Sequence, residues 1–487
     1  GGLIFLGICF MGGQTPVPPL EKAWEFKADS SIRAPGLIAA CDMIFFGSGA
    51  GRIYALDATS GQVRWTFKMG KAVKPPLVTI DGIIFAASED KNFYALDART
   101  GEKRWQFSTG KDFVEWTYLG QFYKILYYGP VVVADGIVYI ATKDKNLYAL
   151  DAQTGKERWR FIAGGEISPP AVSYGAVFFG SKDKRVYALD VNSGEKLWEA
   201  KTGHGKHSCP IIAEGKVLIA GDDDLYALNP YNGTILWEVK KALYYQSLPA
   251  VAGGLAFCTK DLAVIDLASG KEVEKIPSPS KDFSNVVVVD GTLYAMAHPK
   301  LTYGPLGALS EFLFVYDVAT RKEKWQAYFN THKVRLGEIG EGFIFVVDDK
   351  LIALNVSKFT KRWESDKLPH LPIFEDMGKP VIAYGMVFIS CGEVAYAFRS
   401  SKDPACQHSL EISDEISPSP KYEAGTLRAE RIWPNCCCLC CGPAEEFAKV
   451  WAEFKFLGRP FHRAEEKGIP YCGECIKKVK SGREKPA

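Results

Sequence analysis

The sequence has almost no net charge, which argues against one broad class of function. Its 59 Lys and Arg residues are balanced by 57 Asp and Glu residues, leaving a formal charge of +2. A protein dedicated to nucleic acid needs a basic face, because binding neutralises phosphates. Although a local basic patch is compatible with this balance, we expect no nucleic-acid partner.

The sequence also lacks an apolar run long enough to cross a bilayer, which takes about 20 residues. The apolar stretch at residues 3–11 is shorter and resembles the core of a secretory or lipoprotein signal. Within it, Leu6-Gly7-Ile8-Cys9 is an imperfect lipobox that would make Cys9 the lipidation site. The alternative is a strand or tail that packs on the body of the protein.

Residues 12–20 are rich in Pro and Gly and are typical of a stiff linker. We therefore interpret residues 1–20 as a signal-like tether followed by a linker. This interpretation predicts a protein that is exported or lies at the cell surface, tethered to a membrane through its N-terminus. If the segment is not a signal, the protein is cytoplasmic.

The overall composition is that of a folded protein, with 47% hydrophobic and 24% charged residues. The 46 glycines and the 13% aromatic residues indicate many turns and much β-structure. A chain of 487 residues has room for two or three domains, or for one repeat array with an appendage.

Self-similarity dominates the middle of the chain and favours the repeat array. The strong copies read RIYALDATSGQVRW at 52–65, NFYALDARTGEKRW at 92–105, NLYALDAQTGKERW at 146–159, RVYALDVNSGEKLW at 185–198 and DLYALNPYNGTILW at 224–237. Weaker copies lie at 263–275, 314–325, 351–363 and 394–398.

Each part of the repeat has a structural reason. The YAL run alternates as a strand does, and Asp-x-x-Thr/Ser-Gly is turn chemistry, with the Asp accepting backbone N–H groups and the Gly adopting a positive φ. An apolar strand precedes each copy, and Asp-Gly pairs at 81–82, 135–136 and 290–291 predict earlier hairpins. One unit is thus a four-stranded antiparallel sheet, and such units stack radially into a propeller.

The repeat resembles that of the pyrroloquinoline-quinone-like β-propeller family, over roughly residues 21–400. This family includes quinoprotein dehydrogenases and the outer-membrane assembly lipoprotein of the Bam complex. The resemblance implies an all-β closed propeller, with eight blades usual and nine YAL-type strands present here. The last unit lacks its Trp strand, so we expect residues 21–27, which contain Trp24, to close the ring beside it.

The resemblance implies two different functions. Quinoprotein dehydrogenases need a Ca²⁺ cage, a Trp platform and a vicinal disulfide, and we cannot place that set in the repeats. We therefore predict a non-catalytic scaffold for protein–protein interactions, with no catalytic or cofactor-binding residues and no quinone. The alternative is a quinone-dependent redox enzyme or electron-transfer protein that uses the funnel.

Two groups of loop residues are candidate binding sites, and the first of them lines one mouth of the propeller channel. Alignment of the repeats places five residues on the loops that enter the inner strands, namely Lys74, Tyr128, Ser168, Ser208 and Ser247. They offer no acid–base pair. The segment GHGKHSCP carries His204, His207 and Cys209, whose spacing suits a transition metal, but we favour a polar loop with a half-buried Cys.

An insertion at 111–129 is unusually aromatic. Such a loop is a plausible contact surface for a protein or ligand. The candidate contact residues are Trp116, Tyr118, Phe122, Tyr123 and Tyr127. The alternative is a hairpin that packs on its own blade.

The C-terminal region differs in composition. Residues 401–432 are interpreted as a linker or strap, and residues 433–487 as a small zinc-ribbon-like module whose four thiolates hold Zn²⁺. The predicted ligands form two Cys-x-x-Cys pairs, Cys438 with Cys441 and Cys472 with Cys475. Cys437 and Cys440 have the same spacing as the first pair. Gly442 directly follows Cys441, however, and so favours Cys438 with Cys441 as the ligands. An iron–sulfur cluster or disulfides are the alternatives.

Overall fold

The computed structural model divides into two compact units, Gly1–Ser401 and Lys402–Ala487. In the first, it describes residues 15–33, 36–113, 116–120, 123–128, 131–203, 205, 207–243, 247–278, 283–297, 311–329, 335–340, 342–347, 350–355, 360–366, 368 and 378–401. In the second, it describes residues 446–450, 455–456, 459–460 and 467–471. The described residues contain no helix that is long and apolar enough to cross a membrane.

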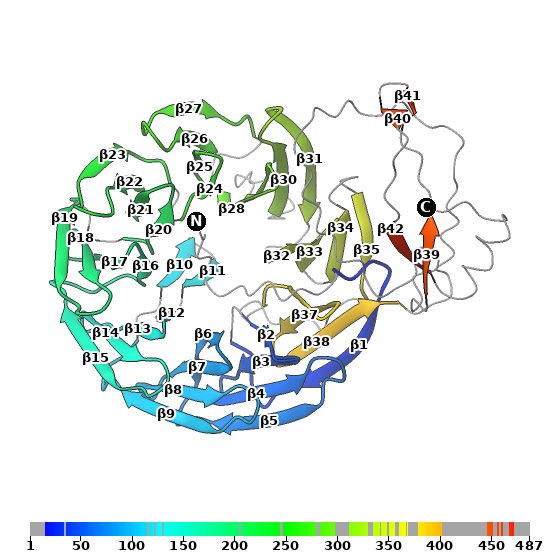
Figure 1. The fold of residues 1–487 in the computed structure, drawn as a ribbon, viewed down its shortest axis with the longest axis horizontal. Coiled ribbons are helices and arrows are strands. Elements are labelled where there is room, and N and C mark those ends of the chain that lie inside the picture. The colour runs from blue at the N-terminus through cyan, green and yellow to red at the C-terminus, as the bar shows by residue number, and fades with distance from the viewer. Residues whose placement is uncertain are drawn as a thin grey trace, which may run out of the picture. The chain divides into compact units, whose positions relative to one another are not determined.

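The first unit is a ring of nine four-stranded antiparallel blades (Figure 1). Blades 1 to 4 are β2–β5 (Ile38–Ala40, Met43–Gly47, Arg52–Asp57, Val63–Lys68), β6–β9 (Val73–Ile80, Ile83–Ser88, Asn92–Asp97, Lys103–Ser108), β12–β15 (Val131–Ala134, Ile137–Ala141, Asn146–Asp151, Glu157–Ile162) and β16–β19 (Ala171–Ser173, Ala176–Ser181, Arg185–Asp190, Lys196–Lys201).

Blades 5 to 8 are β20–β23 (Ile211–Ala213, Lys216–Gly221, Asp224–Leu228, Ile235–Val239), β24–β27 (Ala250–Ala252, Leu255–Phe257, Ala263–Asp266, Glu272–Lys275), β28–β31 (Phe283–Val289, Thr292–Ala297, Glu311–Asp317, Lys322–Phe329) and β32–β35 (Arg335–Gly340, Phe343–Val347, Leu351–Asn355, Thr360–Glu364). Of the two alternatives for the blade count, nine is therefore right. The weak repeats at 263–275 and 314–325 lie in separate blades.

Blade 9 is built from both ends of the propeller chain. Its strands are β36 (Val381–Ala383), β37 (Met386–Cys391), β38 (Val394–Ser400) and β1 (Leu20–Lys27), and β1 pairs antiparallel with β38. Trp24 lies opposite Ala397. The prediction that the Trp24 strand closes the ring is confirmed, and closure leaves no open sheet edge between first and last blades.

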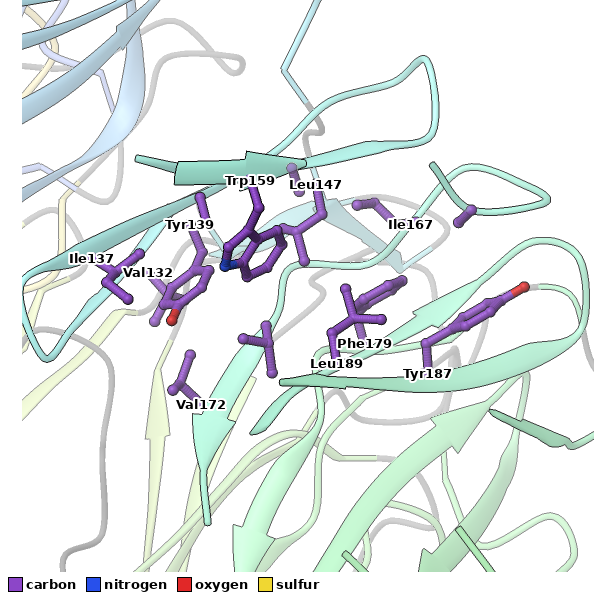
Figure 2. Close-up of a cluster of buried hydrophobic side chains, with 14 residues drawn as sticks. Val132, Ile137, Tyr139, Leu147, Trp159, Ile167, Val172, Phe179, Tyr187 and Leu189 are labelled. Atoms are coloured by element: carbon purple, nitrogen blue, oxygen red, sulfur yellow. The ribbon is translucent and has the colours of Figure 1, made fainter. Parts of the chain in front are cut away.

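The hydrophobic core lies between blades rather than within them. Among the described residues, nine buried clusters each join two successive blades, and one of them joins blade 9 to blade 1. Figure 2 shows the cluster between blades 3 and 4, where Trp159 and Tyr139 point toward Phe179 and Leu189. Because a blade has apolar side chains on both faces, it is stable only between two neighbours.

The repeated Trp docks on the turn of the next blade. Trp105 of blade 2 donates its indole N–H to the carbonyl of Ala152 in blade 3, at 3.0 Å. Its ring lies against Gly155, where a Cβ would come within 2.5 Å of the indole. Trp24, Trp65, Trp159, Trp198 and Trp237 make the same pair of contacts with the blade that follows each of them. The motif's Trp and Gly are thus two halves of one interblade contact.

The contact between blades 6 and 7 departs from this pattern. Strand register places Glu274 where other blades carry Trp, and Arg321 where they carry the turn Gly. The two side chains form an ion pair at 3.4 Å. A polar pair thus replaces the aromatic contact at this junction, which explains why the repeat at 263–275 is weak in sequence.

Two smaller elements lie outside the blades. The insertion after blade 2 forms the two-stranded sheet of β10 (Trp116–Gly120) and β11 (Tyr123–Tyr128). In the second unit, β39 (Glu446–Val450) pairs with β42 (Lys467–Tyr471), and β40 (Lys455–Phe456) pairs with β41 (Arg459–Pro460).

Candidate functional site

The turn of each repeat is held by an Asp carboxylate with two roles. In blade 1, Oδ1 of Asp57 accepts hydrogen bonds from the backbone N–H groups of Thr59 and Ser60. Its Oδ2 accepts from the Arg64 guanidinium at 2.7 Å. The Arg64 guanidinium and the Ser60 donors lower the pKa of Asp57 to about 2. Each such carboxylate therefore stays ionised at neutral pH and orders its turn.

The same Asp–Arg pair recurs in blades 2 and 3, between Asp97 and Arg104 and between Asp151 and Arg158. Sequence reasoning identified the turn Asp but missed its cationic partner. The signal was present, since an Arg stands directly before the Trp in each of the first three strong copies of the repeat.

Three of the loop residues predicted to line the propeller mouth form hydrogen bonds within the protein. The Ser168 hydroxyl accepts the backbone N–H of Gly180 at 3.0 Å, and Ser208 does the same for Ala220. Ser247 hydrogen-bonds the hydroxyl of Thr259. These three serines and Lys74 are buried. Two of these serines, Ser168 and Ser208, tie their loops to the second strand of the blade. That the loops line the channel mouth stays a prediction, and the side chain of Tyr128 lies outside the described residues.

The His and Cys of the GHGKHSCP loop also have structural partners. Nε2 of His207 lies 2.6 Å from the Thr202 hydroxyl, and Nδ1 lies 3.1 Å from the Ser181 carbonyl. With both ring nitrogens engaged, His207 ties two loops together and has no free lone pair for a metal. Cys209 is buried, and burial raises the pKa of its thiol to about 12. These hydrogen bonds support the polar-loop interpretation for His207, whereas Cys209 is buried rather than half-buried. His204 lies outside the described residues.

The aromatic insertion forms a hairpin whose backbone pairs Trp116 with Tyr128 and Thr117 with Tyr127. Of the five predicted contact residues, Trp116 and Tyr118 lie on β10, Tyr123 and Tyr127 on β11, and Phe122 outside the described residues. The hairpin therefore places four of them on two adjacent strands. Whether they bind a partner stays a prediction.

The predicted zinc ligands Cys438, Cys441, Cys472 and Cys475 lie outside the described residues. In the part of the chain that the structure describes, no three His, Cys, Asp or Glu side chains are grouped as metal ligands. The described cysteines, Cys41, Cys209, Cys258 and Cys391, are all free thiols. Cys209, Cys258 and Cys391 are buried, consistent with small apolar core residues.

With the nine blades and their docking turns established, the chain can be compared with known proteins. Residues 21–121, 115–240 and 202–365 match, in three overlapping stretches, the family described as outer membrane protein assembly factor BamB. The chain belongs to this family. Membership in the BamB family explains the YALDxxTGxxxW repeat and supports a propeller scaffold. No curated protein matches the sequence.

Solved structures share the fold at low sequence identity. BamB from Moraxella catarrhalis is 14% identical with a TM-score of 0.47, covering 79% of this chain and 99% of its own. Quinohemoprotein alcohol dehydrogenase from Comamonas testosteroni is 13% identical with a TM-score of 0.51, covering 78% of this chain and 76% of its own. The likeness to the dehydrogenase, with a TM-score above 0.5, establishes a common propeller architecture and leaves the activity undecided.

Proposed function

We propose that this member of the BamB family is a non-catalytic propeller scaffold that binds other proteins. The observation that carries the proposal is the family match over residues 21–365, whose description is that of an assembly factor. The site geometry supports it, because the loop residues Ser168, Ser208 and His207 are engaged in hydrogen bonds that hold the blades together. These side chains therefore stabilise the fold, which favours a scaffold over a catalytic site.

We further propose that the protein is exported and tethered to a membrane. The apolar segment at 3–11 and the lipobox-like Leu6-Gly7-Ile8-Cys9 support the tether. The family description, which names the outer membrane, supports the location.

The scaffold proposal is tested by purifying the full chain from its native host under gentle conditions after chemical cross-linking. We expect a stoichiometric protein partner. In parallel, pyrroloquinoline quinone and Ca²⁺ are added and the visible spectrum is recorded. A bound quinone that is reduced by an alcohol would contradict the scaffold proposal and support the redox alternative. The observation that favours this alternative is the fold shared with a quinohemoprotein alcohol dehydrogenase.

A structural zinc site in the C-terminal module is a separate proposal. The pairs Cys438/Cys441 and Cys472/Cys475 are separated by about 30 residues, a spacing typical of four-thiolate zinc modules. A module this small has little core of its own, so the metal would contribute much of its folding energy. Outside the cytoplasm, bound metal would also protect the thiolates from oxidation.

We expect elemental analysis of the full chain to give one zinc ion per chain, without colour. Replacing Cys472 and Cys475 with Ser should abolish the zinc, because these two residues supply half of the four predicted ligands. Cys41→Ser, which changes a propeller thiol, is the matched control and should retain it. Comparing Cys438→Ser with Cys437→Ser identifies the first pair. Iron with a charge-transfer band would contradict the proposal, as would a metal-free protein whose cysteines react only after reduction.

A further inference from the structure

One position of the repeat changes its chemistry between neighbouring blades. The residue directly before the docking Trp is Arg64, Arg104 and Arg158 in blades 1 to 3. In blades 4 to 6, sequence and register place Leu197, Leu236 and Val273 there. In blade 7 the position is basic again, with Lys324 paired to Asp317 at 2.8 Å.

These three aliphatic side chains are exposed rather than buried. Leu197 is 53% exposed, Leu236 45% and Val273 49%. They lie on β19, β23 and β27, which follow one another along the outer rim of the ring (Figure 1). Exposed apolar residues that gather on one part of a surface indicate a binding site more often than residues scattered singly.

Aromatic side chains extend the row between blades 4 and 5. In blades 2 and 3 the corresponding residues touch, because Arg104 donates to Gln153 at 3.3 Å. The repeat places Tyr231 of blade 5 at the Gln153 position, next to the position of Leu197. Tyr231 is 73% exposed, and its ring centroid lies 5.7 Å from that of Tyr174 in blade 4. Aromatic residues of this kind are common anchors in protein interfaces.

The exchange of Arg for an aliphatic residue also removes the Arg that pairs with the turn Asp, although the charge of Lys216 still acts on Asp266. In blade 4, Oδ1 of Asp190 accepts from the backbone N–H groups of Asn192 and Ser193, as in blade 1. Among the described side chains, no Lys or Arg forms an ion pair with Asp190 or with Asp266, its counterpart in blade 6. The backbone N–H groups and the Ser hydroxyls of these turns lower the pKa of both carboxyl groups, so both are charged at neutral pH.

We propose that this surface, formed by Tyr174, Leu197, Tyr231, Leu236 and Val273, binds a protein segment that carries both aliphatic and basic side chains. The aliphatic side chains would cover the exposed row. The basic side chains of the partner would form ion pairs with Asp190 and Asp266, as Arg64 does with Asp57. The inference rests on the proposed scaffold function and assigns it a surface and a class of partner.

The test uses a variant that the repeat itself suggests. Leu197→Arg with Leu236→Arg restores the residue found in blades 1 to 3, so the fold is expected to survive. Val63→Arg is the matched control, because Val63 is an exposed aliphatic residue in blade 1, outside the row. The probes are two short synthetic peptides of equal length, one alternating Leu with Arg and one alternating Leu with Glu. Binding to the full chain is followed by fluorescence anisotropy.

We expect the Leu/Arg peptide to bind the wild type and the Val63→Arg variant equally, and the double variant at least about tenfold more weakly. The Leu/Glu peptide should bind none of them. Equal binding to the wild type and the double variant overturns the proposal, as does equal binding of both peptides. A wild type that dimerises in sedimentation, with a monomeric double variant, also overturns it by assigning the row to a second copy.

Failure of this inference is separable from failure of the scaffold function. If the double variant still copurifies with the native partner while the peptides show no preference, the scaffold stands and the partner binds elsewhere. If the wild type has no partner at all, the scaffold itself is contradicted.

Discussion

Trp24→Ala is expected to destabilise the propeller by about 3–5 kcal/mol, the usual range for removing a buried Trp. Trp24 is 8% exposed, and its indole N–H donates to the Ala58 carbonyl at 2.9 Å. Its ring fills the space against Gly61. Because β1 is the strand that joins blade 9 to blade 1, losing this contact weakens the closure of the ring. Denaturant unfolding of the full chain, followed by circular dichroism, measures the effect.

The matched control is Glu25→Ala on the same strand. The Glu25 side chain is 57% exposed and pairs only with Lys22 across the surface at 2.6 Å, so the change should cost less than about 1 kcal/mol. Limited proteolysis supplies a second readout, since an opened ring exposes the edge of β38. A Trp24→Ala variant as stable and as protease-resistant as Glu25→Ala would show that the ring does not depend on this closure.

Gly155→Ala is expected to destabilise the protein by about 2–5 kcal/mol, from two additive causes. Gly155 has a φ of +69°, which an L-residue adopts at a cost of about 1–2 kcal/mol. An added Cβ would also lie 2.5 Å from the Trp105 ring, and overpacking of this kind costs about 1–3 kcal/mol. The change in free energy of unfolding, measured with denaturant, gives the total.

Gly136→Ala separates the two causes. Gly136 has a φ of +72°, but an added Cβ there meets nothing within 4 Å. This variant therefore carries only the backbone cost, and the difference between the two variants measures the packing of Trp105 on its turn. If both variants lose the same stability, the Trp–Gly contact contributes nothing and the recurrence of Gly in the motif reflects turn geometry alone.

The docking contact also accounts for how one scaffold can carry different surfaces on different blades. The Trp faces inward onto the next turn, while the residue before it faces solvent. The interblade contact is therefore kept at Trp159, Trp198 and Trp237 while the neighbouring position changes from Arg to Leu. A surface can change in this way with little effect on the closure of the ring.

Much of the architecture followed from the sequence alone. The YAL strands, the Asp-x-x-Thr/Ser-Gly turns and the Asp-Gly hairpins are local features, determined by alternation and backbone conformation within a few residues. Asp81 and Gly82 both have positive φ values, as the hairpin prediction required. The unpaired Trp24 strand also predicted closure, because the last repeat lacked a fourth strand.

The tertiary structure decided what depends on residues far apart in the chain. It settled nine blades over eight, because strand pairing shows that the weak repeat at 263–275, with Glu274 in place of Trp, belongs to a four-stranded sheet of its own. It showed that Ser168 and Ser208 hold their loops to a strand, because the backbone N–H groups that they accept lie 12 residues further along the chain. It also brought Leu197, Leu236 and Val273 into one row, since radial stacking aligns positions that the sequence separates by whole repeats.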